Sequence, residues 1–316
     1  MKRGIVLGAL IAVAGLSLAA AGFQAPPAGA GQGRGEGRRG EGRGRGPQGP
    51  PVAQIEKVSD ILYELLGGGG NTAVFITDGG VTIVDTKLAN WGQAILDKIK
   101  TVTDKPVTRI INTHTHGDHT GSNEFFGATV EIVAQENMKT NMEKLEAFAG
   151  DKSVFLPKKI FKDKTSIGKG KEQIDLYYFG PAHTSGDAFV VFKDLRVMHS
   201  GDAFAGKNVP FIDTTNGGSA VAYGRTIAAA ASKIKNVDTI ITGHAAMRMT
   251  PADLKEYADF NSDFISWVKD EIKAGKTAEQ AGDEYKVPEK YTSRGYPAGG
   301  GGVKANIVTA YKELGK

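Results

Sequence analysis

Four potential metal ligands stand within six residues of this chain. They are His114, His116, Asp118 and His119, in the pattern His-x-His-x-Asp-His, and they include three of the six histidines of the sequence. Imidazole and carboxylate groups suit zinc, iron and related divalent ions. The β-branched stretch 107–111 before them predicts a buried strand. The pattern therefore predicts a metal site where a strand gives way to a loop.

Three more ligand types follow other predicted strands. His183 lies in a Gly/Pro loop, Asp202 in Ser-Gly-Asp and His244 in Thr-Gly-His. One ion would be bound by His114, His116 and His183, and a second by Asp118, His119 and His244, with Asp202 bridging the two. Three protein ligands and an open position are typical of a catalytic zinc site, whereas four protein ligands are typical of a structural one.

The elements that must position these residues alternate between strands and helices. Apolar runs, a hairpin signal at Asp78-Gly79-Gly80 and short β-branched stretches predict strands at 61–66, 73–77, 81–85, 107–111, 129–134, 174–179, 188–192, 195–199 and 239–242. Helical spacing and capping signals predict helices at 90–102, 135–148, 220–234, after Thr250, after Thr277 and at 305–313. Two sheets with helices outside would bury both sheets, and their strand ends could meet at one edge.

The first 53 residues differ in composition from the rest. Residues 1–22 have a basic start, an apolar core and small residues at its end, which favours a cleaved secretory signal over a membrane anchor. Residues 23–53 are rich in Gly, Arg and Pro and predict a disordered leader. The chain has no cysteine, which fits export and excludes any thiolate ligand. We expect a periplasmic or secreted bacterial protein with no stable membrane insertion once the signal is removed.

The net positive charge of the chain comes from its first 52 residues. The whole chain carries +4, but the part after residue 52 has 32 basic and 33 acidic residues. This near-neutral part has no overall field that favours nucleic acid, so a nucleic-acid partner is not expected.

In their order and spacing, these motifs resemble the metallo-β-lactamase superfamily. The matching segments are Val-Asp85-Thr86, the run from His114 to His119, Gly-Pro-Ala-His183-Thr, Ser-Gly-Asp202 and Gly-His244. The resemblance implies an α/β (α+β) fold, a four-layer αββα sandwich over 54–250, followed by a C-terminal helical extension over 251–316. It also implies that Asp85 supports the site without binding metal. Asp202 at the bridging position is similar to the glyoxalase II, lactonase and esterase-like branches rather than to β-lactamases with a cysteine ligand.

The predicted function is a binuclear zinc-dependent hydrolase with two Zn²⁺ per chain. A metal-bridging hydroxide would attack an ester, thioester, lactone or lactam carbonyl of a small molecule, with Asp118 orienting the hydroxide and carrying its proton. Nothing in the chain identifies the substrate. The helical extension could cover the site or form a homodimer.

Other interpretations remain open. The chain could be a β-lactamase without the cysteine ligand, or an iron-dependent oxidoreductase of the persulfide-dioxygenase type, since His114, His183 and Asp202 could bind iron. A nuclease and a non-catalytic metal-binding protein are weaker alternatives. His199 has no place in the motifs and is interpreted as a surface or supporting residue. The segment 67–70 could be a mobile flap or a plain linker, and loops 154–159 and 208–216 could set specificity.

Overall fold

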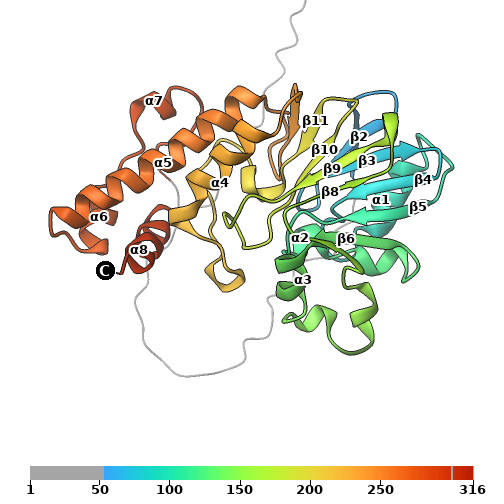
Figure 1. Ribbon diagram of the computed structural model, residues 1–316, viewed down its shortest axis with the longest axis horizontal. Coiled ribbons are helices and arrows are strands. Elements are labelled where there is room, and N and C mark those ends of the chain that lie inside the picture. Colours follow the sequence, from blue (N-terminus) through green and yellow to red (C-terminus); the bar gives the residue numbers. More distant parts are fainter. Residues whose placement is uncertain (1–52, 300–301, 316) are drawn as a thin grey trace, which may run out of the picture. The chain divides into compact units, whose positions relative to one another are not determined.

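Two β-sheets form the centre of the protein in its computed structural model, which describes residues 53–299 and 302–315 (Figure 1). The signal and leader predictions therefore lie outside the described residues. The first sheet follows chain order: β1 (Gln54–Lys57), β2 (Leu62–Leu66), β3 (Thr72–Thr77), β4 (Gly80–Val84), β5 (Val107–Ile111), β6 (Glu131–Gln135) and β7 (Lys159–Phe161). The strands are antiparallel from β1 to β4 and parallel from β4 to β7.

The second sheet has five strands. Its order is β12 (Thr239–Ile241), β11 (Val197–His199), β10 (Phe189–Phe192), β9 (Ile174–Tyr177) and β8 (Lys164–Ile167). Strands β11 and β12 are parallel, and the other pairs are antiparallel.

Eight α-helices surround the sheets in the described part of the chain. They are α1 (Gly92–Ile99), α2 (Gly117–Thr120), α3 (Glu136–Met142), α4 (Ala220–Lys233), α5 (Pro251–Lys273), α6 (Ala278–Glu284), α7 (Glu289–Thr292) and α8 (Val303–Glu313). Capping boxes begin α5 at Thr250 and α6 at Thr277, as the capping signals predicted. No helix among the described residues combines the length and apolar composition needed to cross a bilayer.

The distribution of apolar residues explains the four layers. Successive residues of a strand face opposite sides of the sheet. Ile83 and Ile110 accordingly pack on α1, whereas their neighbours Val84 and Ile111 face the second sheet. The outer face of the second sheet packs on α4 and α5. The order of layers is therefore helix, sheet, sheet, helix, and the predicted αββα sandwich is confirmed.

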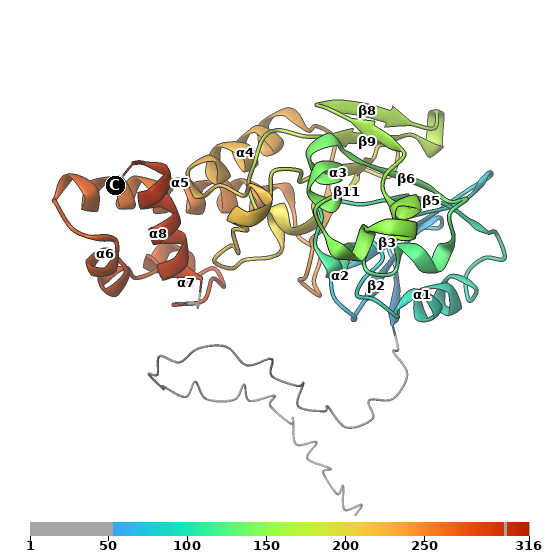
Figure 2. The ribbon, with the colours of Figure 1, turned by 90° about the horizontal axis from the view of Figure 1, so that it is seen from below.

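The C-terminal helices continue the core of the second sheet. Val191 of β10, Tyr257 of α5 and Ile307 of α8 belong to the same buried cluster. Figures 1 and 2 show α4 between the sheets and α6–α8. Two polar contacts add to this packing: Asn306 donates to Pro210 O at 2.8 Å, and Glu313 accepts from the backbone N–H of Ala220 at 2.8 Å. Helix α8 thus fixes both the start of α4 and the loop before it.

Three short strands and one helix end are among the differences from the sequence predictions. Strands β1, β7 and β8 were not predicted, and each lies at the edge of a sheet. The helix predicted over 135–148 ends at Met142, and residues 146–148 and 150–155 form 3₁₀ turns instead. Met138, Met142 and Phe148 pack into a small separate cluster with Leu145, which this break in the helix allows.

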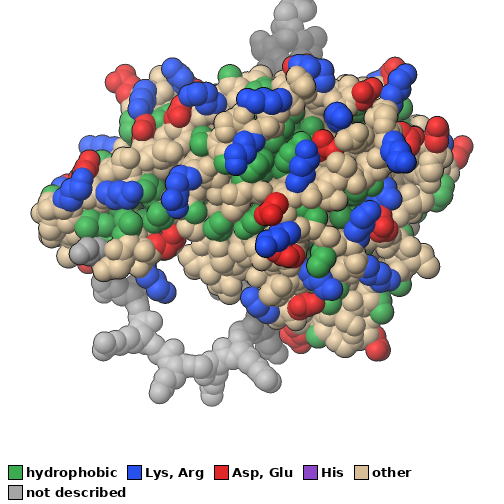
Figure 3. Space-filling view, viewed as in Figure 1, with side chains coloured by type: hydrophobic (Ala, Val, Ile, Leu, Met, Phe, Trp, Pro, Cys, Tyr) green, Lys and Arg blue, Asp and Glu red, His purple; other side chains and the backbone are tan. Residues whose placement is uncertain are grey.

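The surface carries both signs of charge. Figure 3 shows basic and acidic side chains interspersed on one face of the protein. This agrees with the near-neutral balance of the chain after residue 52.

Candidate metal centre

The predicted ligands meet at one edge of the two sheets. The run His114–His119 follows β5, His183 lies between β9 and β10, Asp202 follows β11, and His244 follows β12. Their ligand atoms form two groups, and within each group all ligand atoms lie within 4.8 Å of one another: His114, His116, His183 and Asp202 in the first, and Asp118, His119 and His244 in the second. The structure thus brings all seven predicted ligands together.

Helix α2 explains how one short run serves both groups. The chain is irregular from His114 to His116 and turns into α2 at Gly117. His114 and His116 therefore face the first group, whereas Asp118 and His119, within the helical turn, face the second. The helical turn thus separates the two pairs of ligands.

In the first group, one nitrogen of the His183 ring faces one nitrogen of the His116 ring. His183 Nε2 lies 2.9 Å from His116 Nδ1. The other ring nitrogens are already engaged: His183 Nδ1 donates to Phe211 O at 2.7 Å, and His116 Nε2 donates to Asp213 Oδ2 at 2.7 Å. When both rings are neutral, a lone pair of each nitrogen points into the same space. A cation in that space would turn their repulsion into binding.

Two other buried atoms of the first group have no hydrogen-bond partner in the described part of the chain. Neither His114 Nε2 nor Asp202 Oδ1 has a hydrogen-bond partner among the described residues. Asp202 Oδ2 lies 3.9 Å from His114 Nε2 and 3.6 Å from His183 Nε2. Ligands of a tetrahedral zinc ion, at about 2.0–2.1 Å from it, are about 3.3 Å apart. Buried polar atoms normally have partners, so these atoms fit a metal ion.

The second group has similar spacing. His119 Nε2 lies 3.4 Å from His244 Nε2 and 3.7 Å from Asp118 Oδ2, and His244 Nε2 lies 3.4 Å from Asp118 Oδ2. Asp202 reaches this group as well, with Oδ1 at 3.3 Å from His119 Nε2 and Oδ2 at 3.1 Å from His244 Nε2. Asp202 thus touches both groups, which is the position that a bridging ligand requires.

Asp85 orients a histidine in each group. Its Oδ2 accepts from His119 Nδ1 at 2.7 Å and from Thr113 Oγ1 at 2.7 Å, while its Oδ1 accepts from Thr113 N at 2.8 Å. Because the Thr113 hydroxyl donates to Asp85, it accepts from His114 Nδ1 at 3.0 Å. These bonds leave Nε2 of both histidines free for a metal, as outer hydrogen bonds commonly do. Asp85 itself has φ of 62°, an unusual backbone conformation for a residue other than glycine.

Burial and the nearby carboxylates set the charges of these groups. Burial lowers the pKa of His183 to about 4 and holds that of His114 well below its usual value. Burial also acts to lower the pKa of His119, but the carboxylates of Asp202 and Asp85 raise it well above its usual value. Burial opposes ionisation of Asp202, yet His119 and His244 hold its pKa well below the ordinary range. His114 and His183 are thus neutral imidazoles, and His119 in the second group carries a proton that a metal must displace.

Comparison with known proteins identifies the family. Residues 66–244 match the family model of the metallo-beta-lactamase superfamily. The chain belongs to this superfamily. The superfamily predicted from the motifs is therefore confirmed.

A relative of known class is distant in sequence from this chain. The chain is 26% identical over 166 residues to the metallo-beta-lactamase type 2 of Elizabethkingia meningoseptica, and the match covers 48% of this chain and 62% of the relative. The chain thus matches less than two thirds of that relative's length.

Solved structures share the fold. The sec-alkylsulfatase Pisa1 from Pseudomonas sp. has a TM-score of 0.69 at 16% identity, over 83% of this chain and 50% of that chain. A metallo-beta-lactamase from Pontibacter korlensis has a TM-score of 0.58 at 18% identity, over 66% of this chain and 99% of that chain.

The glycine-rich loop before β3 packs tightly against the metal centre. Gly70 N donates to Asp118 O at 3.0 Å. A Cβ on Gly70 would overlap the His119 ring, and one on Gly69 would overlap Asp118. The loop therefore packs closely against Asp118 and His119. It is a packed wall that fixes the second group of ligands.

Lys87 forms a hydrogen bond to this loop. Its side chain is fully buried, and Nζ donates to Leu65 O and Gly70 O, both at 2.8 Å. Burial lowers its pKa from 10.5 to about 7. Sequence reasoning missed this residue, since a lysine after a strand end is normally exposed.

The sequence analysis did not identify two other carboxylates near the ligands. Asp213, which orients His116, lies in the loop 208–216 that was named only for specificity. Asp187 is buried and accepts from the backbone and hydroxyl of Thr184, next to the ligand His183. Burial raises the pKa of Asp187 to about 7. A single Asp in a loop carries no motif, so no sequence signal distinguished either residue.

His199 is buried rather than at the surface. Its Nε2 lies 3.1 Å from Asn71 O, and its Nδ1 accepts from Gly201 N at 3.1 Å. Of the two predicted alternatives, the supporting role fits, because these bonds tie the start of β3 to the segment that carries Asp202.

A cavity of about 380 Å³ opens over the metal centre. Its walls combine ligands with the loop after Asp202: His116, Asp118, His183, Asp202, Ala205, Asn208, Val209, Pro210, Phe211 and His244. Phe211 is 65% exposed, and its ring centroid lies 5.9 Å from that of His116 and 5.7 Å from that of His183. The loop 208–216 thus provides an apolar wall beside the ligands, where the sequence placed a specificity loop.

Proposed function

We propose that the protein is a binuclear zinc-dependent hydrolase of an ester, thioester, lactone or lactam carbonyl. The observation that carries the proposal is the pair of ligand groups joined by Asp202 at the floor of an open cavity. When bound, zinc ions would lower the pKa of water to about 7 and polarise a carbonyl oxygen.

The position and exposure of Asp118 support it as the residue that moves a proton. It lies in the wall of the cavity, and its side chain is 29% exposed, whereas Asp202 is 10% exposed. Asp118 Oδ2 lies within 3.7 Å of two second-group nitrogens. An exposed carboxylate at this place can accept a proton from the attacking water and pass it to the leaving group.

The deciding experiment compares Asp118→Asn with wild type after zinc loading. We expect turnover to fall by about 10²-fold or more, the usual contribution of a general acid–base group. Zinc content is measured in parallel, so that loss of metal is separated from loss of proton transfer. Asp104→Asn, in the irregular segment before β5, is the matched control. Unchanged hydrolysis by a fully loaded Asp118→Asn protein would refute the assigned role.

Substrate class is tested by a screen of purified protein. A lactone, a thioester, an aryl ester and a β-lactam cover the carbonyl compounds, and a secondary alkyl sulfate is added because a similar fold occurs in a sec-alkylsulfatase. Elemental analysis separates zinc from iron, which would be bound by the same histidines and Asp202. Predominant iron together with oxygen consumption would replace this proposal by the oxidoreductase alternative.

Export remains part of the proposal because the basic and apolar start of the chain is typical of a signal. Cell fractionation and the mass of the mature protein test it. A full-length protein in the cytoplasm would contradict it.

A further inference from the structure

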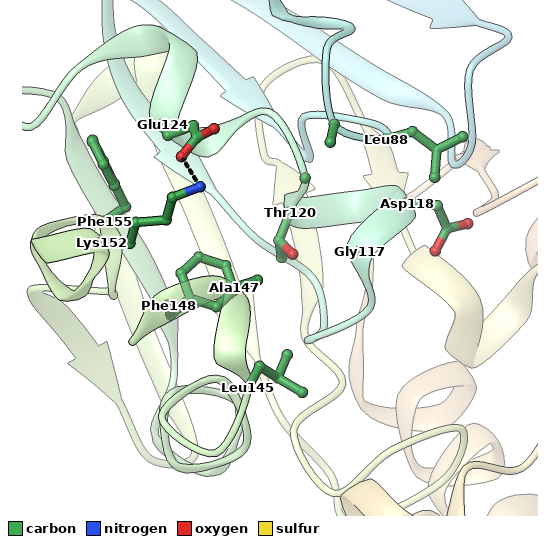
Figure 4. Close-up of a pocket in the computed structure, with 12 residues that line it drawn as sticks. Leu88, Gly117, Asp118, Thr120, Glu124, Leu145, Ala147, Phe148, Lys152 and Phe155 are labelled. Atoms are coloured by element: carbon green, nitrogen blue, oxygen red, sulfur yellow. Dashed lines mark ion pairs between the residues drawn. The ribbon is translucent and has the colours of Figure 1, made fainter. Parts of the chain in front are cut away.

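A second cavity, of about 620 Å³, lies beside the metal centre (Figure 4). It lies between α2, the loop after β4 and the 3₁₀ turns that follow α3. Its walls are Leu88, Ala89, Gly117, Asp118, Thr120, Gly121, Glu124, Leu145, Ala147, Phe148, Lys152 and Phe155. We call it the Phe148 pocket.

The walls of the Phe148 pocket suit an uncharged apolar group. Leu88, Leu145, Phe148 and Phe155 supply most of its large side chains. Its only basic side chain, Lys152, pairs with Glu124 at 2.9 Å, and Figure 4 shows this pair at one end of the pocket. The pair neutralises itself, so it provides no free charge for an ionic ligand.

Asp118 connects this pocket to the metal centre. Asp118 lines both the Phe148 pocket and the cavity over the ligands. Figure 4 shows Asp118 at the opposite side of the pocket from Phe155 and Lys152. A molecule whose reacting bond lies at Asp118 could therefore extend past Gly117 into the Phe148 pocket, and a Cβ at Gly117 would meet nothing within 4 Å.

One wall residue is apolar and exposed without an evident structural reason. Leu88 is 46% exposed, although it follows a fully buried lysine. An apolar ligand would remove this surface from water, and apolar burial is favourable in proportion to area. Exposed apolar side chains that gather beside a reactive centre commonly mark a ligand site.

We propose that the Phe148 pocket binds the aliphatic acyl group of a carbonyl substrate. The proposal rests on the proposed hydrolytic function and narrows its substrates to esters, thioesters or lactones with an apolar acyl chain. Complete burial of a methylene group is worth about a fourfold change in affinity. We expect kcat/KM to rise about two- to fourfold for each added methylene until the pocket is full.

The test blocks the pocket without touching the metal centre. Ala147 is exposed and lines the pocket, whereas Ala149, two residues later, is exposed and does not line it. Ala147→Trp should fill the pocket, and Ala149→Trp is the matched control. Equal thermal midpoints and zinc contents show that both variants fold and retain metal.

The first measurement is kcat/KM for p-nitrophenyl esters from acetyl to octanoyl. Wild type and Ala149→Trp should prefer longer acyl chains, and Ala147→Trp should lose that preference while keeping acetyl ester hydrolysis. The same dependence on chain length in all three proteins would overturn the proposal.

A second measurement does not depend on hydrolysis. Titration calorimetry with octanamide should detect binding to wild type and Ala149→Trp, and binding at least tenfold weaker to Ala147→Trp. If no ester is hydrolysed but this binding pattern holds, the hydrolytic function fails and the apolar pocket stands. Equal octanamide binding by the three proteins, or none by wild type, would overturn the pocket.

Discussion

Asp85→Asn tests whether the hydrogen bonds around the metal centre set metal affinity. Asp85 is fully buried and accepts three hydrogen bonds of 2.7–2.8 Å, two from Thr113 and one from His119. Asparagine has the same shape but only one acceptor oxygen. The backbone N–H of Thr113 can only donate, so it holds the asparagine oxygen at the Oδ1 position. The amide nitrogen is then directed toward Thr113 Oγ1 and His119 Nδ1.

This orientation reverses one bond at His119. The amide would donate to Nδ1, which moves the imidazole proton to Nε2, the nitrogen that faces the second group of ligands. His114 should be affected less, because the Thr113 hydroxyl has a second lone pair with which to accept from it. Changes to such outer hydrogen bonds typically weaken metal binding 10- to 100-fold. The binding free energy of one of the two ions should therefore become less favourable by about 1.4–2.7 kcal/mol.

Competition with a chromophoric chelator measures both zinc affinities. We expect Asp85→Asn to lower the affinity for one zinc ion about 10- to 100-fold and to change the affinity for the other only a fewfold. Asp213→Asn is the matched comparison, because Asp213 bonds His116 and should affect the other ion. Two unchanged affinities in Asp85→Asn would refute the reasoning, and so would an equal loss at both sites.

Three further changes test the surroundings of the centre. Gly70→Ala places a Cβ against the His119 ring, so zinc content by elemental analysis should fall by about one ion, and a fully loaded variant would contradict the packed wall. Lys87 releases its proton in the folded state above about pH 7 but at about 10.5 when unfolded, so the free energy of unfolding gains up to about 1.4 kcal/mol per pH unit between these values. Urea unfolding of Lys87→Met should lack this gain relative to wild type, and parallel pH profiles would disprove it. Removal of metal by a chelator should lower the midpoint of thermal unfolding. Zinc added at about 1,000 times its Kd should raise the free energy of unfolding by about 4 kcal/mol. A midpoint that does not change with zinc would argue against binding to the folded state.

The central strands and the ligands could be predicted because apolar residues and motifs mark them. Strand β5 has the predicted bounds, and Thr250 and Thr277 begin helices as their capping signals indicated. In contrast, β7 and β8 are short edge strands whose exposed lysines hide any alternation. Charged residues on edge strands are common because they discourage pairing with another chain, so the pattern is weak where a sheet ends.

The groups around the ligands were harder to predict than the ligands. Asp85 follows a predicted strand and matches a family motif, so its supporting position was anticipated. Asp213 bonds His116 across 97 residues of chain, and Lys87 bonds a loop through backbone carbonyls. Neither contact depends on local spacing. Only the folded structure reveals them.

The contact between α8 and the loop 208–216 has a consequence for biosynthesis. Asn306 anchors Pro210, and the same loop supplies Asp213 to His116 and Phe211 O to His183. During translation, the ligands from His114 to His244 are all made before α8 exists. The loop that orients two of them gains its anchor only when the last helix has emerged. Full metal affinity should therefore arise only after α8 has been made.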